Sequence, residues 1–115
     1  MRLDEWRRRR EERQRALERA LSDVVAQLRA LGARKVILFG SLARGDIGPH
    51  SDLDLIVILP PTHSGRVWMQ RIYAEVDRRM AGDILAYTED EFREVLEHST
   101  FLRRAVREGK VVYEA

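Results

Sequence analysis

Two aspartates, Asp52 and Asp54, stand at the start of the apolar run 53–59. If this run is a strand, side chains two residues apart point to the same side of it. Two neighbouring carboxylates repel each other and are costly to bury unless a positive charge lies between them. A hard divalent cation, which binds carboxylate oxygens, meets that requirement. The pair therefore predicts a metal site.

A glycine–serine pair, Gly40 and Ser41, ends the preceding apolar run 36–39. Glycine lets the backbone approach a phosphate closely, and serine offers an N–H group and a hydroxyl at a helix start. Arg44 follows on the same side of a short helix, where it can bind triphosphate oxygens or neutralise Asp46 and the aspartates. A phosphate site beside a metal site is the apparatus of metal-assisted phosphoryl or nucleotidyl transfer.

A third carboxylate, Asp83, opens the next predicted strand just as the pair opens the one before it. If these two strands are neighbours, all three carboxylates meet at one end of the sheet. Two would then hold metal, and Asp83 would ligate a second ion or accept the proton of an attacking hydroxyl. The alternative for Asp83 is a Gly-Asp turn residue without a chemical role. The alternative of purely structural roles is weaker for Asp52 and Asp54, because unpaired buried carboxylates are expensive.

The remaining candidates have less support from their surroundings. His50 stands beside Ser51 and Asp52, but a lone histidine in a loop is typical of a surface residue, and neither His63 nor His98 has the spacing of a metal ligand. Ser41 lacks the His–Asp support that a covalent nucleophile needs.

Apolar runs and helix signals predict a small α/β (α+β) domain that spans residues 1–115, with a mixed sheet of about four strands flanked by helices. The predicted strands are 35–39, 52–59, 83–87 and 111–113, and the predicted helices are 2–31, 41–45, 66–80, 89–97 and 99–107. Thr88 and Glu91 predict a capping box at the fourth helix. Val67, Ile72, Val76 and Met80 are the inward residues expected of the third helix.

The first predicted helix is long and divides into two halves. Its second half has an apolar stripe at helical spacing, formed by Leu17, Leu21, Val24, Val25, Leu28 and Leu31. Residues 1–16 are rich in Arg and Glu and predict a charged, solvated helical extension laced with Glu–Arg pairs. The alternative is that residues 1–16 bind RNA or the acidic face of a partner protein. Leu3 and Trp6 predict packing against the body of the protein or another chain, including a second copy.

The composition limits the classes of protein that remain. The chain has no cysteine, which excludes disulfides and thiolate metal sites. It has no apolar stretch of membrane-spanning length and no apolar N-terminal signal region, so we expect a cytoplasmic protein. With 21 basic and 19 acidic residues, the net charge of +2 permits contact with nucleic acid without arguing for it.

The runs Gly40–Gly45 and Ser51–Leu55 together resemble the signature of the nucleotidyltransferase superfamily that includes DNA polymerase beta. That signature has a hydrophobic residue, Gly-Ser, a spacer and then Asp-x-Asp. The short chain and the GSLARGD sequence are most similar to the minimal nucleotidyltransferases. The resemblance extends from residue 17 to residue 113.

This resemblance implies a nucleotidyltransferase fold in which Gly40 and Ser41 hold the nucleotide phosphates. It also implies that Asp52 and Asp54 ligate Mg²⁺. Asp83 matches the third carboxylate of the family, which inactive members often lack, so its presence favours activity.

The resemblance further implies a partner protein. Minimal members lack the helical domain that binds base and acceptor in larger relatives, and they are often paired with a helical HEPN-type protein. There they act as antitoxins, and some transfer AMP to a tyrosine of the toxin. The expected function is Mg²⁺-dependent transfer of a nucleoside monophosphate, AMP from ATP, to a hydroxyl of such a partner. The alternatives are a catalytically silent module that neutralises the partner by binding it, and an RNA nucleotidyltransferase.

Overall fold

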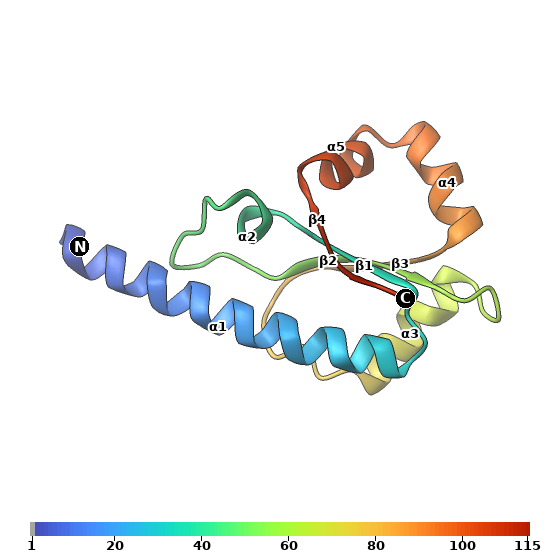
Figure 1. Cartoon of the computed structure of the whole chain (residues 1–115), viewed down its shortest axis with the longest axis horizontal. Coiled ribbons are helices and arrows are strands. Elements are labelled where there is room, and N and C mark those ends of the chain that lie inside the picture. The colour runs from blue at the N-terminus through green and yellow to red at the C-terminus, as the bar shows by residue number, and fades with distance from the viewer. Residues whose placement is uncertain (1) are drawn as a thin grey trace.

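A computed structural model describes residues 2–115 as a four-stranded sheet with helices on both faces (Figure 1). The elements in chain order are α1 (Leu3–Ala30), β1 (Lys35–Phe39), α2 (Ser41–Arg44), β2 (Asp54–Leu59), α3 (Gly65–Glu75), β3 (Ile84–Thr88), α4 (Glu89–His98), α5 (Thr100–Glu108) and β4 (Lys110–Glu114). The predicted α+β architecture, with four strands and a long first helix, is confirmed.

The sheet is mixed, with the strand order β3-β2-β1-β4. Strand β1 is antiparallel to both of its neighbours, and its register places Phe39 opposite Asp54. Strands β2 and β3 are parallel, with Leu55 opposite Ile84, and α3 forms the crossover that a parallel pair requires. The end of β1 and the starts of the other three strands therefore lie at one edge of the sheet.

The two central strands, β1 and β2, are buried on both faces, which explains their nearly continuous apolar sequences. On one face α1 and α3 pack against the sheet, and the main residues of this layer are Leu17, Val24, Leu28, Val36, Leu55, Val57, Trp68 and Ile72. On the other face α4 and α5 pack against it, with Ile37, Phe39, Ile56, Ile58, Leu102 and Ala105 in the core. Figure 1 shows the two layers below and above the sheet.

Three predicted strand starts differ from the structure: β4 begins at Lys110 and not at Val111, and the other two concern site residues. Strand β2 begins at Asp54 and not at Asp52, and β3 begins at Ile84 and not at Asp83. The pairing of β1 with β2 ends at Asp54 because the chain turns away from the sheet at Gly40, where φ is 80°. Strand alternation therefore does not govern the direction of the Asp52 side chain.

The third predicted helix is wrong at its end and at one of its four predicted inward residues, because Ile72 and Val76 are buried as predicted and Met80 is partly buried against the same core. Helix α3 ends at Glu75, where the sequence predicted a helix to residue 80. The side chain of Val67 is 37% exposed, whereas Trp68 is 2% exposed and lies in the core. Trp68 donates a hydrogen bond of 2.9 Å from Nε1 to the carbonyl of Pro60, so its one polar group is satisfied while the ring is buried.

The predicted capping box of α4 is confirmed. The hydroxyl of Thr88 accepts a hydrogen bond from the Glu91 amide, and the Glu91 carboxylate accepts one from the Thr88 amide. The same carboxylate oxygen accepts a bond of 2.9 Å from the amide of Gly65. Glu91 therefore joins the start of α4 to the start of α3.

Helix α1 is continuous over 28 residues, which includes most of the charged extension. Met1 lies outside the described residues. Although α1 is long, no helix within residues 2–115 combines the length and the apolar composition required to cross a bilayer.

Candidate active site at one edge of the sheet

The structure brings Asp54 and Asp83 into contact. The main-chain amide of Asp83 donates a hydrogen bond of 3.0 Å to Oδ1 of Asp54. The parallel register holds them together, because the amide of Leu55 donates a bond of 2.8 Å to the carbonyl of Asp83. Asp52 precedes β2 in the adjoining loop, and its charge acts on Asp54 as that of Asp83 does.

The environment of Asp54 disfavours its charged form. Partial burial raises the pKa of Asp54 above its ordinary value of 3.8, and the charges of Asp83 and Asp52 raise it further. The bond from the Asp83 amide and the charge of Arg44 oppose this shift without cancelling it. A cation placed between the carboxylates would relieve the repulsion.

The donor set fits a hard divalent cation in its chemistry. The carboxylates of Asp52, Asp54 and Asp83 are oxygen ligands of the type that such ions prefer. Within residues 2–115 no three acidic or histidine side chains are already arranged closely enough to enclose an ion. Asp52 and Asp83 are exposed, so their side chains can turn toward an ion while the Asp83 amide holds Asp54.

Gly40 forms a close wall against the Asp54 carboxylate. A Cβ atom at Gly40 would stand 2.5 Å from Oδ2 of Asp54, and its φ of +80° is one that other residues rarely adopt. Ser41 begins α2 directly after this turn. The glycine–serine turn and Asp54 therefore lie against each other.

Arg44 extends from the end of α2. Its guanidinium pairs with Asp46 at 3.2 Å and lies 3.8 Å from Glu108 of α5. The pairing with Asp46 is one of the two alternatives expected from the sequence, and the charge of Arg44 also acts on Asp54.

The family model described as a nucleotidyltransferase domain matches residues 17–113. The chain belongs to the nucleotidyltransferase domain family. The family expected from the Gly-Ser and Asp-x-Asp runs is thereby confirmed, and with it a transferase that moves a nucleoside monophosphate from a nucleotide substrate. Members of this family generally use a divalent metal.

A solved structure shows the same fold. It is that of a protein from Sulfolobus solfataricus, provisionally described as a nucleotidyltransferase, with a TM-score of 0.60 and 22% sequence identity. The alignment covers 92% of this chain and 87% of that chain. No curated protein is similar enough to count as a match.

Gly82, directly before Asp83, packs closely against the segment that precedes β2. A Cβ atom at Gly82 would stand 1.8 Å from the carbonyl oxygen of Leu53, so only glycine fits beside the segment between the two aspartates. The amide of Leu53 also donates a bond of 2.9 Å to the carbonyl of Ala81. The sequence predicted only a helix end at Gly82, and the missed signal was its place directly before Asp83.

Two arginines of α1 hold the loop that leads to Asp52. Arg10 Nε donates a bond of 3.0 Å to the carbonyl of Ile47, and Arg13 Nε donates one of 2.8 Å to the carbonyl of Ser51. The sequence predicted a solvated extension here, and for these two side chains that is wrong. The missed signal is their helical spacing from Leu17, which puts them on the buried side of α1.

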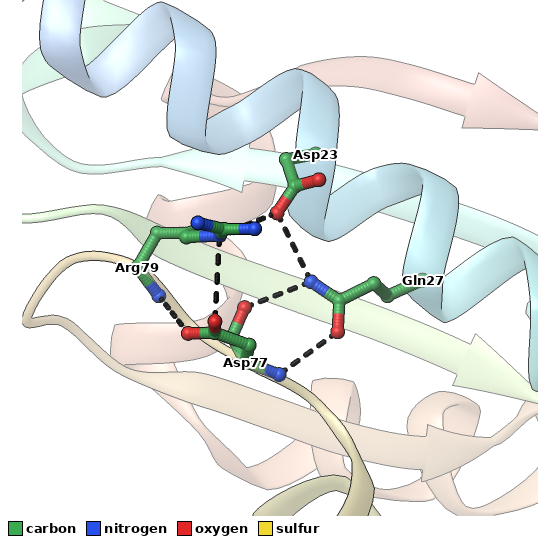
Figure 2. Close-up of polar contacts among 4 residues, drawn as sticks. All are labelled: Asp23, Gln27, Asp77 and Arg79. Carbon is green, nitrogen blue, oxygen red and sulfur yellow. Dashed lines mark hydrogen bonds and ion pairs between the residues drawn. The ribbon is translucent and has the colours of Figure 1, made fainter.

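A second set of polar contacts joins α1 to the chain ahead of β3 (Figure 2). Gln27 exchanges two hydrogen bonds of 2.8 Å with the main chain of Asp77, and Arg79 Nε donates a bond of 2.9 Å to Asp23. The bond to Asp23 raises the pKa of the Arg79 guanidinium. These contacts fix the segment that delivers Asp83 to the site.

Proposed function

We propose that this domain is a Mg²⁺-dependent minimal nucleotidyltransferase that transfers AMP from ATP to a hydroxyl of a partner protein. The partner is a helical HEPN-type toxin, for which the domain acts as the antitoxin. The observation that carries the proposal is the contact of Asp54 with both Asp83 and the Gly40 turn. This contact places carboxylates that can bind a metal next to a glycine turn whose backbone can approach a phosphate closely.

Each site residue then has a role. Asp52 and Asp54 ligate Mg²⁺, which when bound offsets the negative charge of the phosphates. Gly40 and Ser41 hold the triphosphate through their backbone, and Arg44 exchanges Asp46 for a phosphate oxygen.

Asp83 acts on the acceptor or on a second ion. As a base, it takes the proton of the acceptor hydroxyl while the hydroxyl oxygen bonds to the α-phosphorus. The bond from that phosphorus to the bridging oxygen breaks, and pyrophosphate leaves. As a ligand, Asp83 would instead help to hold a second Mg²⁺.

The exposure of the site supports an acceptor on another chain. Asp52 and Asp83 are exposed, so a hydroxyl carried by a separate protein can reach them. Leu3 and Trp6 are exposed apolar residues at the start of α1, and they offer a contact surface for that protein.

Transfer of label from ATP tests the proposal. The protein is incubated with Mg²⁺, ATP labelled at the α-phosphate and the product of the neighbouring gene. We expect label on that product, and its loss in the D52A and D54A variants, while D90A, at an exposed residue on α4, serves as the control. Absence of label, or label undiminished in D52A and D54A, would refute the proposal.

The exposed pair Leu3 and Trp6 also favours the alternative of a silent binding module. That module would neutralise its partner by contact alone. Neutralisation that survives in D54N but is lost in W6A would support this alternative.

A further inference from the structure

A cavity of about 420 Å³ opens beside the proposed phosphate site, between the end of β1, α2 and α5. Its volume falls within the range of about 300–1,000 Å³ that is typical of small-molecule sites. The residues that matter here are Phe39, Gly40, Arg44, Phe101, Arg104 and Glu108. In Figure 1, α2 lies beyond the end of β1 and α5 lies on the upper side of the sheet.

The cavity adjoins the carboxylate site at Gly40. Gly40 forms part of its wall and also touches Asp54. Phe39 is the cross-strand partner of Asp54, and paired residues lie on the same face of a sheet. A ligand whose phosphates lie against Gly40 therefore has this cavity as its neighbouring space.

Phe101 gives the cavity an exposed aromatic wall. This side chain is 59% exposed, although Leu102 and Ala105 of the same helix are buried. Its ring meets the buried ring of Phe39 edge to face, with 6.0 Å between the ring centroids and 85° between the ring planes. The contact supports Phe101 from one side, and the exposed remainder of its ring is available for stacking.

Glu108 organises two arginines around the same cavity. Its carboxylate accepts a bond of 2.9 Å from Arg104 Nε and lies 3.8 Å from Arg44. A guanidinium is planar and carries several donors, so it can stack on or bond to a flat heteroaromatic ring. An aromatic wall beside guanidinium groups is the combination that binds nucleic acid bases.

We propose that this cavity binds the nucleobase of the nucleoside triphosphate, with Phe101 stacking on the base and Arg104 donating to its edge. Glu108 is a positioning residue that holds Arg104. The inference rests on the proposed function, because it requires a nucleotide whose phosphates lie at Gly40. It adds base recognition by α5 to that function.

Equilibrium binding of two probes in the presence of Mg²⁺ tests the inference. ATP has a base, and inorganic tripolyphosphate presents the phosphates alone. We expect F101A to weaken ATP binding about tenfold, as loss of base stacking does, and to leave tripolyphosphate binding unchanged. F101Y keeps a stacking ring and should bind ATP like the wild type, and R104A should lose affinity for ATP in the same direction as F101A.

Y73A is the matched control, because Tyr73 is an exposed aromatic residue of α3, at 65%, on the other face of the sheet. It should bind ATP like the wild type. Thermal unfolding of each variant checks that the fold is kept.

The outcomes separate this inference from the proposed function. If F101A and R104A bind ATP as the wild type does, the cavity is not the base site, and the proposed function stands. If they bind ATP normally but transfer less label to the acceptor, the cavity holds the acceptor and the inference is wrong. If the wild type binds neither probe, both proposals fail.

Discussion

The amide of Asp83 donates a hydrogen bond to one carboxylate oxygen of Asp54, across 29 positions of sequence. The other oxygen of Asp54 faces Gly40. The carboxylate is thus held by a main-chain bond from Asp83, just before β3, and bounded by the main chain of the turn after β1. Its orientation depends on backbone geometry at both places, and substitutions there provide direct tests.

G40A should abolish transfer while G45A preserves it. Both glycines have a φ of +80°, so alanine at either position should cost about 1–2 kcal/mol in left-handed backbone strain. Only at Gly40 would the new Cβ also collide with the Asp54 carboxylate, since a Cβ at Gly45 would meet no atom of residues 2–115 within 4 Å. Urea unfolding and label transfer measure the two effects. Equal activity in the two variants would contradict the assigned role of Gly40.

D54N should be more stable than the wild type at neutral pH without metal. The raised pKa of Asp54 means that its ionised form costs folding stability at neutral pH, and asparagine removes that charge while its oxygen can still accept from Asp83. Added Mg²⁺ should then stabilise the wild type and leave D54N unchanged. Melting temperatures with MgCl₂ and with EDTA check both statements, and D90N is the control. An equal Mg²⁺ shift in wild type and D54N would exclude Asp54 as a ligand.

The capping box should make stability depend on pH in the acid range. The Glu91 carboxylate accepts a hydrogen bond from the Thr88 amide, and this bond is the main reason why the pKa of Glu91 lies below its ordinary value of 4.5. The stabilisation is therefore present above pH 4.5 and is lost as the pH falls through the lowered pKa.

Urea unfolding at several pH values, with E91Q and E91A, measures this dependence. The free energy of unfolding of E91Q should lack this pH dependence, and that of E91A should be lower by about 1 kcal/mol at neutral pH. E97Q, at an exposed position on the same helix, should retain the full dependence. An E91Q profile identical to that of the wild type would show that this carboxylate does not contribute.

Replacing both Arg10 and Arg13 by alanine should impair transfer more than it impairs folding. The two side chains hold carbonyls of the loop before Asp52, and a hydrogen bond from a charged donor contributes about 1.5–3 kcal/mol. A double substitution of Arg8 and Arg9, which are exposed on the same helix, removes equal charge without touching the loop. Label transfer and urea unfolding of both double variants measure this. If both lose label transfer equally, and RNA binding falls steeply with salt, the result would instead favour an RNA-binding role for this segment.

Local features of this chain could be predicted from its sequence. The apolar runs gave the four strands, and the Thr88–Glu91 spacing gave the cap of α4, because both depend on neighbouring residues. The end of α3 could not be predicted, since Val76 continues the helical spacing of apolar residues while its backbone is extended. Burial of Val76 is satisfied in either conformation.

The site could be predicted only in part, because strand order is a long-range property. Three acidic residues at strand starts suggested a cluster, but the neighbouring positions of Asp54 and Asp83 follow from β2 pairing with β3. The roles of Arg13 and Phe101 depend on contacts with segments distant in sequence, a loop for Arg13 and strand β1 for Phe101. Composition marked Arg13 only as part of a charged segment.

Because α1 is one uninterrupted helix, it fixes the angular phase between two distant sets of contacts. Arg13 contacts the loop before Asp52, and Asp23 and Gln27 contact the chain before Asp83. Inserting one residue between these sets would turn one relative to the other by about 100° and separate them by about 1.5 Å. The length and pitch of α1 thus set the spacing between the loop before Asp52 and the chain before Asp83. They determine the geometry of the site as the carboxylates do.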